Sequence, residues 1–163
     1  MRRFAFFAPL AAAIAVFAPA MAEPASIHVT LGGDLQEKAE GLGRREVQEQ
    51  ADRLAEVVHD VLARDGALDG ARIDLVLTDL KPNRPTFEQM VDRPGLDGFR
   101  SRSIGGATIE GQITTADGRT LPVRYDRYST SLAEVRGFSA WQDADRAYRR
   151  LAENLADGRY VSR

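Results

Sequence analysis

The chain has 163 residues with 22 basic and 24 acidic side chains, a formal net charge of −2. This balance argues against a dedicated nucleic-acid binder, which normally carries a basic excess. The sequence has no cysteine, which excludes disulfides, thiolate chemistry and lipidation at a cysteine. The two histidines, His28 and His59, have no neighbouring Cys or His in the sequence, so the pattern predicts no metal site and no cofactor.

The first 22 residues form a predicted export signal. A basic start precedes an apolar run from Phe4 to Ala18, too short to span a bilayer as a permanent helix. The small residues Ala20 and Ala22 occupy the positions that signal peptidase reads, so we expect cleavage before Glu23. Cleavage would leave residues 23–163 as a single domain, with 20 basic and 24 acidic residues and a net charge of −4.

The basic residues of the whole chain are 20 arginines and 2 lysines, and alanine is abundant. This composition is typical of GC-rich bacterial genomes. Together with the export signal it favours a periplasmic location, with secretion as the alternative. No second long apolar segment follows the signal, so the sequence predicts no transmembrane anchor after cleavage.

Two elements are predicted in the first half of the mature chain. Residues 27–31 alternate between apolar and polar side chains, the period of a strand with one buried face. Residues 34–43 are polar and contain glycine, and we expect a loop there. From 44 to 65 apolar residues recur every three or four positions, which predicts a long amphipathic helix ended by Gly66.

Three strands follow in the prediction. Residues 72–78 alternate again, and residues 107–114 and 121–126 predict a hairpin around an Asp117-Gly118 turn. Proline cannot donate a ladder hydrogen bond, so Pro122 favours a place for the return strand at a sheet edge.

A last helix is expected before Gly158. Ser139 is predicted as its N-cap, and Gln142 three residues later completes a capping-box pattern. The order of elements predicts the α+β class, a two-layer sandwich in which about four strands carry two main helices on one face. The order strand, helix, strand permits a parallel right-handed crossover between the first two strands.

The connection from residue 80 to 106 departs from this regular pattern. Between Lys81 and Ser103 it carries five basic and three acidic side chains, and connections this long are often functional. Arginines bind carboxylate or phosphate groups through two hydrogen bonds, and glycines let a partner approach the backbone closely. The candidate residues for binding an anionic ligand or a partner are Arg84, Arg93, Arg100, Arg102, Gly105 and Gly106. The structural alternative is that the arginines are solvated or ion-paired and that the glycines relieve a β-bulge.

A resemblance enters at this connection. The strings Leu80–Thr86, Pro94–Asp97 and Ser103–Ala107, followed by a hairpin, resemble families of bacterial envelope proteins without an assigned activity. Many members are periplasmic proteins or lipoproteins. The resemblance runs from the second strand to the final helix and implies a small α/β envelope domain. The chain departs from the lipoprotein members because it lacks the lipidated cysteine.

The sequence predicts no catalytic residue. The segment from Gly137 to Trp141 lacks the second glycine of a nucleophile elbow, and the many carboxylates could pair only through the fold. The leading hypothesis is therefore a non-catalytic periplasmic binding or assembly module for an envelope protein or an anionic ligand. The alternatives are a small envelope hydrolase that uses carboxylates and a structural subunit that oligomerises through the hairpin edge.

Overall fold

The structure is a computed structural model that describes residues 25–135 and 137–162. The expected signal peptide, with Ala20, Ala22 and Glu23 at its cleavage site, lies outside the described residues. The elements in chain order are β1 (Ser26–Leu31), α1 (Gly33–Leu42), α2 (Arg44–Asp65), β2 (Arg72–Lys81), α3 (Phe87–Asp92), β3 (Gly106–Thr114), β4 (Thr120–Tyr128), α4 (Gln142–Ala156) and β5 (Val161–Ser162).

The strands form one mixed sheet in the order β1-β2-β3-β4-β5. β1 and β2, which α1 and α2 separate in the sequence, are parallel neighbours in the sheet, as the order of elements permits. β3 pairs antiparallel with both β2 and β4. The α+β class is therefore confirmed. The described residues hold five strands and four helices, rather than the expected four strands and two main helices.

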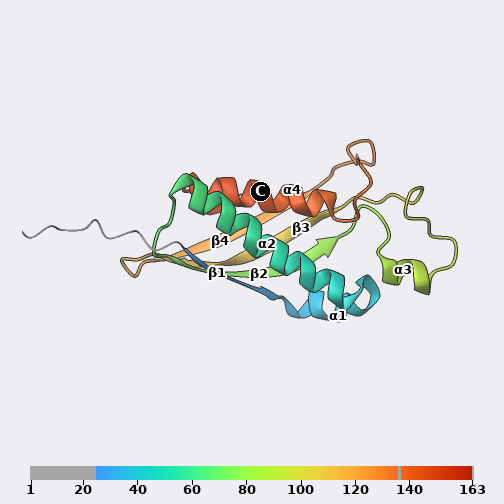
Figure 1. The fold of residues 1–163 in the computed structure, drawn as a ribbon, viewed down its shortest axis with the longest axis horizontal. Helices are drawn as coiled ribbons and strands as arrows, with labels where there is room; N and C mark the ends of the chain where they lie inside the picture. Colours follow the sequence, from blue (N-terminus) through green and yellow to red (C-terminus); the bar gives the residue numbers. More distant parts are fainter. Residues whose placement is uncertain (1–24, 136, 163) are drawn as a thin grey trace, which may run out of the picture.

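The helices α2 and α4 lie side by side on one face of the sheet (Figure 1). Alternate strand residues point into this layer, and the apolar stripes of both helices cover them. Fully buried examples are Ile73, Leu75, Leu77, Ile109, Ile113, Leu54, Val58, Tyr148 and Leu151. Burial of this apolar surface is the main stabilising contribution.

The expected loop at 34–43 is a helix, α1, and that prediction was wrong. Leu35, Ala39 and Leu42 are buried at spacings of four and three, which is a helical stripe of only three residues. The glycines on either side and the polar residues between them mask so short a pattern. By contrast, α2 has the predicted bounds and ends at Gly66 in a left-handed conformation.

The start of α4 also differs from the expectation. The helix begins at Gln142 with Trp141 as its N-cap residue, and the predicted capping box between Ser139 and Gln142 does not form. Ser139 Oγ accepts only a long 3.4 Å bond from the amide of Trp141. The cap comes instead from a remote residue, since Asn83 Oδ1 accepts the amide N–H of Asp143 at 2.8 Å.

The strand β4 lies next to the edge of the sheet rather than at the edge. β5 has only two residues and pairs with Arg124 and Tyr125 alone. At Pro122 the outer side of β4 therefore has no strand partner among the described residues. Pro122 itself thus lies at an unpaired edge, as its missing N–H predicts. β5 was missed because two residues carry no periodic signal.

Candidate functional site

The connection 80–106 and the connection between β4 and α4 meet at one end of the sheet (Figure 1). The backbone amide of Asn83 donates to the carbonyl of Ala140 at 2.6 Å, and the amide of Ser103 donates to the carbonyl of Asn83 at 2.9 Å. We call the exposed parts of α3 and of residues 93–104, 130–135 and 137–140 the loop surface.

A buried polar network fixes the base of the loop surface. Asn83 is 1% exposed and Asp143 is 4% exposed. Asn83 Nδ2 donates to Asp143 Oδ2 at 2.5 Å, and Ser129 Oγ donates to the same oxygen at 2.6 Å. Arg146 Nη1 lies 3.0 Å from Asp143 Oδ1. A buried carboxylate with three donors is well compensated, so this network anchors both connections on the first turn of α4.

Arg84, one of the predicted binding residues, is turned inward. It is 5% exposed, and its guanidinium donates to the carbonyl oxygens of Phe99 and, at 2.9 Å, Gly137. The guanidinium carbon also lies 5.4 Å from the centre of the Phe138 ring, within cation–π range. Its Nε has no hydrogen-bond partner among the described residues. Arg84 therefore ties the two connections together and holds the loop surface in shape.

A second tie runs from α2. Glu46 Oε1 accepts the amide N–H of Phe87 at 3.0 Å, and its Oε2 accepts the indole N–H of Trp141 at 3.2 Å. The short helix α3 begins with a capping box between Thr86 and Gln89. One carboxylate thus positions α3 and the approach to α4 together.

Gly105 and Gly106 lie at close approaches within the chain. A Cβ at Gly105 would sit 2.6 Å from the Asn83 side chain, and one at Gly106 would overlap the carbonyl oxygen of Arg127. Gly106 also has a φ of 152°, which few other residues adopt. In the structure these two glycines make room for neighbouring parts of the same domain.

Two of the predicted arginines, Arg93 and Arg102, line a cavity of about 330 Å³ beside α3. Lys81 is a third cation in the lining, and the remainder is mainly apolar, contributed by Pro82, Pro85, Leu96 and Ile104. Arg100 is exposed and lies outside this lining. Its backbone amide donates to Asp97, and that bond, with another from Phe99, holds the pKa of Asp97 below its usual range.

The loop surface is unusually apolar for an exposed region. Among the described residues, six of the seven large hydrophobic side chains that are exposed belong to it: Phe87, Val91, Phe99, Ile104, Leu132 and Phe138. Phe99 is 75% exposed and Phe138 is 76% exposed, with ring centroids 6.4 Å apart. Exposed apolar groups gathered in this way mark an interaction site more often than singly scattered ones do.

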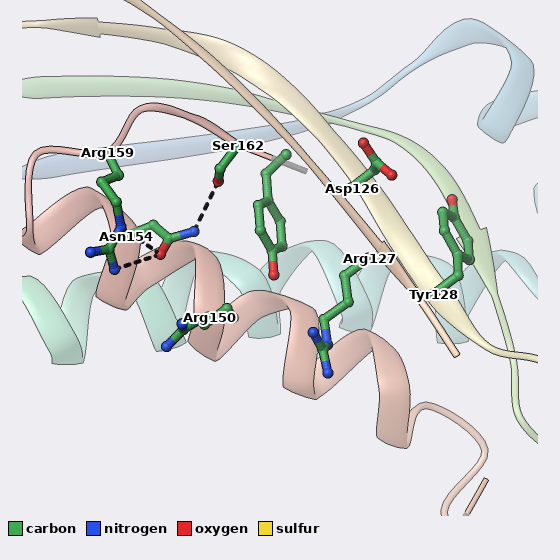
Figure 2. A pocket seen from close by; sticks show the side chains of 8 residues that line it. Asp126, Arg127, Tyr128, Arg150, Asn154, Arg159 and Ser162 are labelled. Atoms are coloured by element: carbon green, nitrogen blue, oxygen red, sulfur yellow. Dashed lines mark hydrogen bonds between the residues drawn. The ribbon is translucent and has the colours of Figure 1, made fainter. Parts of the chain in front are cut away.

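The structure shows a second hollow that sequence reasoning missed. A polar cavity of about 520 Å³ lies between β4 and α4 and is closed at one end by β5. Figure 2 shows Arg150 and Asn154 on α4 and Arg159 and Ser162 in the chain after it. Asn154 Nδ2 donates to Ser162 Oγ at 2.9 Å, and Arg159 Nη2 donates to Asn154 Oδ1 at 2.9 Å. We call this hollow the α4–β4 groove.

Two smaller hollows extend the α4–β4 groove along α4. They have volumes of about 410 and 340 Å³, and Arg127 lines both as well as the first cavity. Arg146 and Arg149 on α4 add to Arg150 on the same side. Burial raises the pKa of Tyr125, which also lines the groove. The sequence signal was the spacing of these α4 arginines, but only the fold brings Arg127 beside them.

A polar cluster lies at the end of the sheet where the two connections meet. Tyr128 donates to Asp79 Oδ2 at 2.8 Å and lies 2.7 Å from Thr108 Oγ1, while Lys38 Nζ is 3.1 Å from Asp79 Oδ1. Burial alone would raise the pKa of Asp79, but the bonds from Tyr128 and Lys38 and the nearby charge of Lys81 hold it below its ordinary value. Burial raises the pKa of Tyr128 strongly.

In residues 25–135 and 137–162 no three His, Asp or Glu side chains gather as metal ligands. No helix in the same residues has the length and apolar character to cross a membrane. The chain matches no protein-family model and no curated protein sequence. The function must therefore be inferred from the geometry, and the resemblance to envelope families stays a prediction.

Proposed function

We propose that the protein is a non-catalytic binding module of the bacterial envelope and that it docks a partner protein on the loop surface. The observation that carries the proposal is the gathering of exposed aromatic and aliphatic side chains at this one end. Aromatic groups of this kind are enriched among the residues that dominate binding energy. The rigid base beneath them supports the same conclusion, because a preformed surface loses little entropy when it binds.

The exposed arginines beside the apolar side chains favour a partner segment that is apolar at its centre and places carboxylates opposite them. Arg93, Arg100 and Arg102 are exposed there, while Asp97 is engaged by the amides of its own turn. Arginine next to aromatic rings is the composition common at protein interfaces. The opposite charge on the partner would add to the rate of association and to specificity.

A hydrolase fits the carboxylates of the described residues less well. Glu134 and Asp143 line one hollow together, but Asp143 is engaged by three donors. Hydrogen bonds from Thr130 lower the pKa of Glu134, whereas a general acid needs a raised pKa. The hydrogen bonds of Glu134 and Asp143 therefore favour a structural role for both carboxylates over acid–base catalysis.

The proposal is tested by quantitative capture of partners from periplasmic extract. The wild-type protein is compared with a Phe99→Ser/Phe138→Ser variant and with an Arg100→Ala/Arg102→Ala variant. Removing two central aromatic side chains should weaken the binding of a partner by about 2 kcal/mol or more, which is roughly 30-fold in affinity. The arginine variant should weaken the binding of a partner less and mainly at low salt, because added salt screens the arginine charges in the wild type.

Matched controls keep the comparison specific. Val161→Ser removes an exposed apolar side chain from outside the loop surface, and Arg45→Ala/Arg64→Ala removes two exposed arginines of α2. The same partners should be retained by both controls. Equal recovery by wild type and the loop-surface variants, each shown to be folded by its melting curve, would defeat the proposal.

A further inference from the structure

The cavity beside α3 differs in shape and lining from the rest of the loop surface. Its volume of about 330 Å³ is at the lower end of the range for small-molecule sites. It is built by the end of β2 with the residues that follow, by α3 with the turn after it, and by the approach to β3. These segments lie together at one end of the domain (Figure 1). The apolar side chains of its lining are all aliphatic: Pro82, Pro85, Leu96 and Ile104.

The polar side chains of the cavity supply positive charge. Among the described residues, Lys81, Arg93 and Arg102 line it and no carboxylate does. The ion pairs within residues 25–135 and 137–162 include neither Arg93 nor Arg102. Lys81 Nζ lies 3.8 Å from Asp79 Oδ2, a loose pair. A hollow lined by charges of one sign between apolar walls concentrates ions of the opposite sign, so the lining favours an anion.

Hydrogen bonds and prolines form the cavity without a ligand. The amide of Ser103 donates to the carbonyl of Asn83 at 2.9 Å, and Ser103 Oγ donates to the carbonyl of Pro82 at 2.5 Å. These bonds join the two strands of chain that border the cavity. The rings of Pro82 and Pro85 fix their own backbone φ angles. A preformed site loses little conformational entropy when a ligand binds.

We propose that this cavity binds a small amphiphilic anion, in which a carboxylate or phosphate head group is carried on a short aliphatic chain. The head group meets Arg93 and Arg102, because a guanidinium offers two parallel N–H donors to such an oxyanion, and Lys81 adds a third charge. The aliphatic chain packs against the prolines, Leu96 and Ile104. Small-molecule sites commonly combine an apolar lining with a few polar groups that orient the ligand. The proposal does not rest on partner docking, since the site is complete in this chain alone.

The test titrates octanoate into the purified protein by calorimetry. Octanoate should bind with a sub-millimolar Kd, and each methylene removed, through hexanoate to butanoate, should weaken binding by about two- to fourfold. Octanol and octylamine should bind about tenfold more weakly or not at all, because they lack the anionic head group. Octyl phosphate is titrated in parallel, and the tighter of the two anions identifies the head group. No binding of either anion, or equal binding of octanoate and octanol, would overturn the proposal.

Paired variants locate the bound anion. Arg93→Gln/Arg102→Gln should lose about tenfold or more in octanoate affinity, whereas Arg100→Gln should bind as wild type does, because Arg100 is an exposed arginine outside the lining. Ile104→Asp places a carboxylate in the lining and should weaken binding by a similar factor. Its control is Val91→Asp, at an exposed position of α3 outside the lining. Melting curves show that each variant is folded.

Two results would contradict this location. Equal octanoate affinity of wild type and Arg93→Gln/Arg102→Gln would overturn the role of the arginines. The Phe99→Ser/Phe138→Ser variant should bind octanoate as wild type does, since neither ring lines the cavity. A loss of octanoate binding in that variant would place the anion on the aromatic side chains instead. The same variant separates this proposal from partner docking, because it is expected to lose the partner and keep octanoate.

Discussion

Substitution of Asn83 by alanine tests how the loop surface is held. The change leaves the amide of Asp143 without its acceptor and removes one of three donors to the buried carboxylate. A buried donor left unpaired costs about 1–3 kcal/mol, and a hydrogen bond to a charged group contributes about 1.5–3 kcal/mol. Allowing for incomplete additivity, we expect a loss of about 3 kcal/mol in the free energy of unfolding. For a domain of this size that lowers Tm by roughly 10 °C.

Urea denaturation with a constant m value measures this loss, and hydrogen exchange should quicken at the amides of Asp143 and Ser103. Asn154→Ala is the matched control, since Asn154 is also a buried asparagine, with 5% exposure. Its partners, Ser162 and Arg159, lie toward the surface, so its loss should be about 1 kcal/mol. If Asn83→Ala costs no more than Asn154→Ala, the remote cap does not hold α4 in the way described.

Three other expectations follow from the structure. Gly106→Ala should cost more than about 2 kcal/mol in a urea melt, because the added carbon would overlap the carbonyl of Arg127, and a near-neutral result would contradict this contact. The lowered pKa of Asp79 stabilises the folded state above about pH 4, and this contribution is lost as the pH falls through the folded-state pKa; Asp79→Asn should therefore be less stable than wild type at pH 7 but not at pH 2, whereas a constant difference would refute the assignment. The intact mass of protein recovered from the periplasm should be that of a chain beginning at Glu23, and the mass of a chain that retains Met1 would contradict the export prediction.

Much of the fold could be predicted because its signals are long. The stripe of α2 repeats over 22 residues, and the hairpin of β3 and β4 combines alternation with a strong turn. α1 was missed because it buries only three residues, and β5 because two residues show no period. Short elements of this kind owe their structure to the neighbours on which they pack, and a local pattern does not contain those neighbours.

The sequence singled out a connection that forms part of the candidate surface, but not the roles of its residues. The length and composition of the connection 80–106 indicated this segment as a candidate, and the structure places exposed apolar side chains and three exposed arginines on it. The role of Arg84 depends on Gly137, 53 residues away, and the role of Asn83 depends on Asp143, 60 residues away. The α4–β4 groove likewise needs Arg127 to lie beside α4. Such pairings arise from sheet order and helix placement, which the sequence pattern specifies only coarsely.

The most direct test of the central proposal is photo-crosslinking in living cells from single positions on the surface. A photoreactive phenylalanine analogue replaces Phe99, Phe138 or, as control, Val161, all of which are exposed. The proposal predicts that Phe99 and Phe138 capture the same envelope protein and that Val161 does not. Crosslinks of equal yield from all three positions, or none from Phe99 and Phe138 in folded and exported protein, would contradict it.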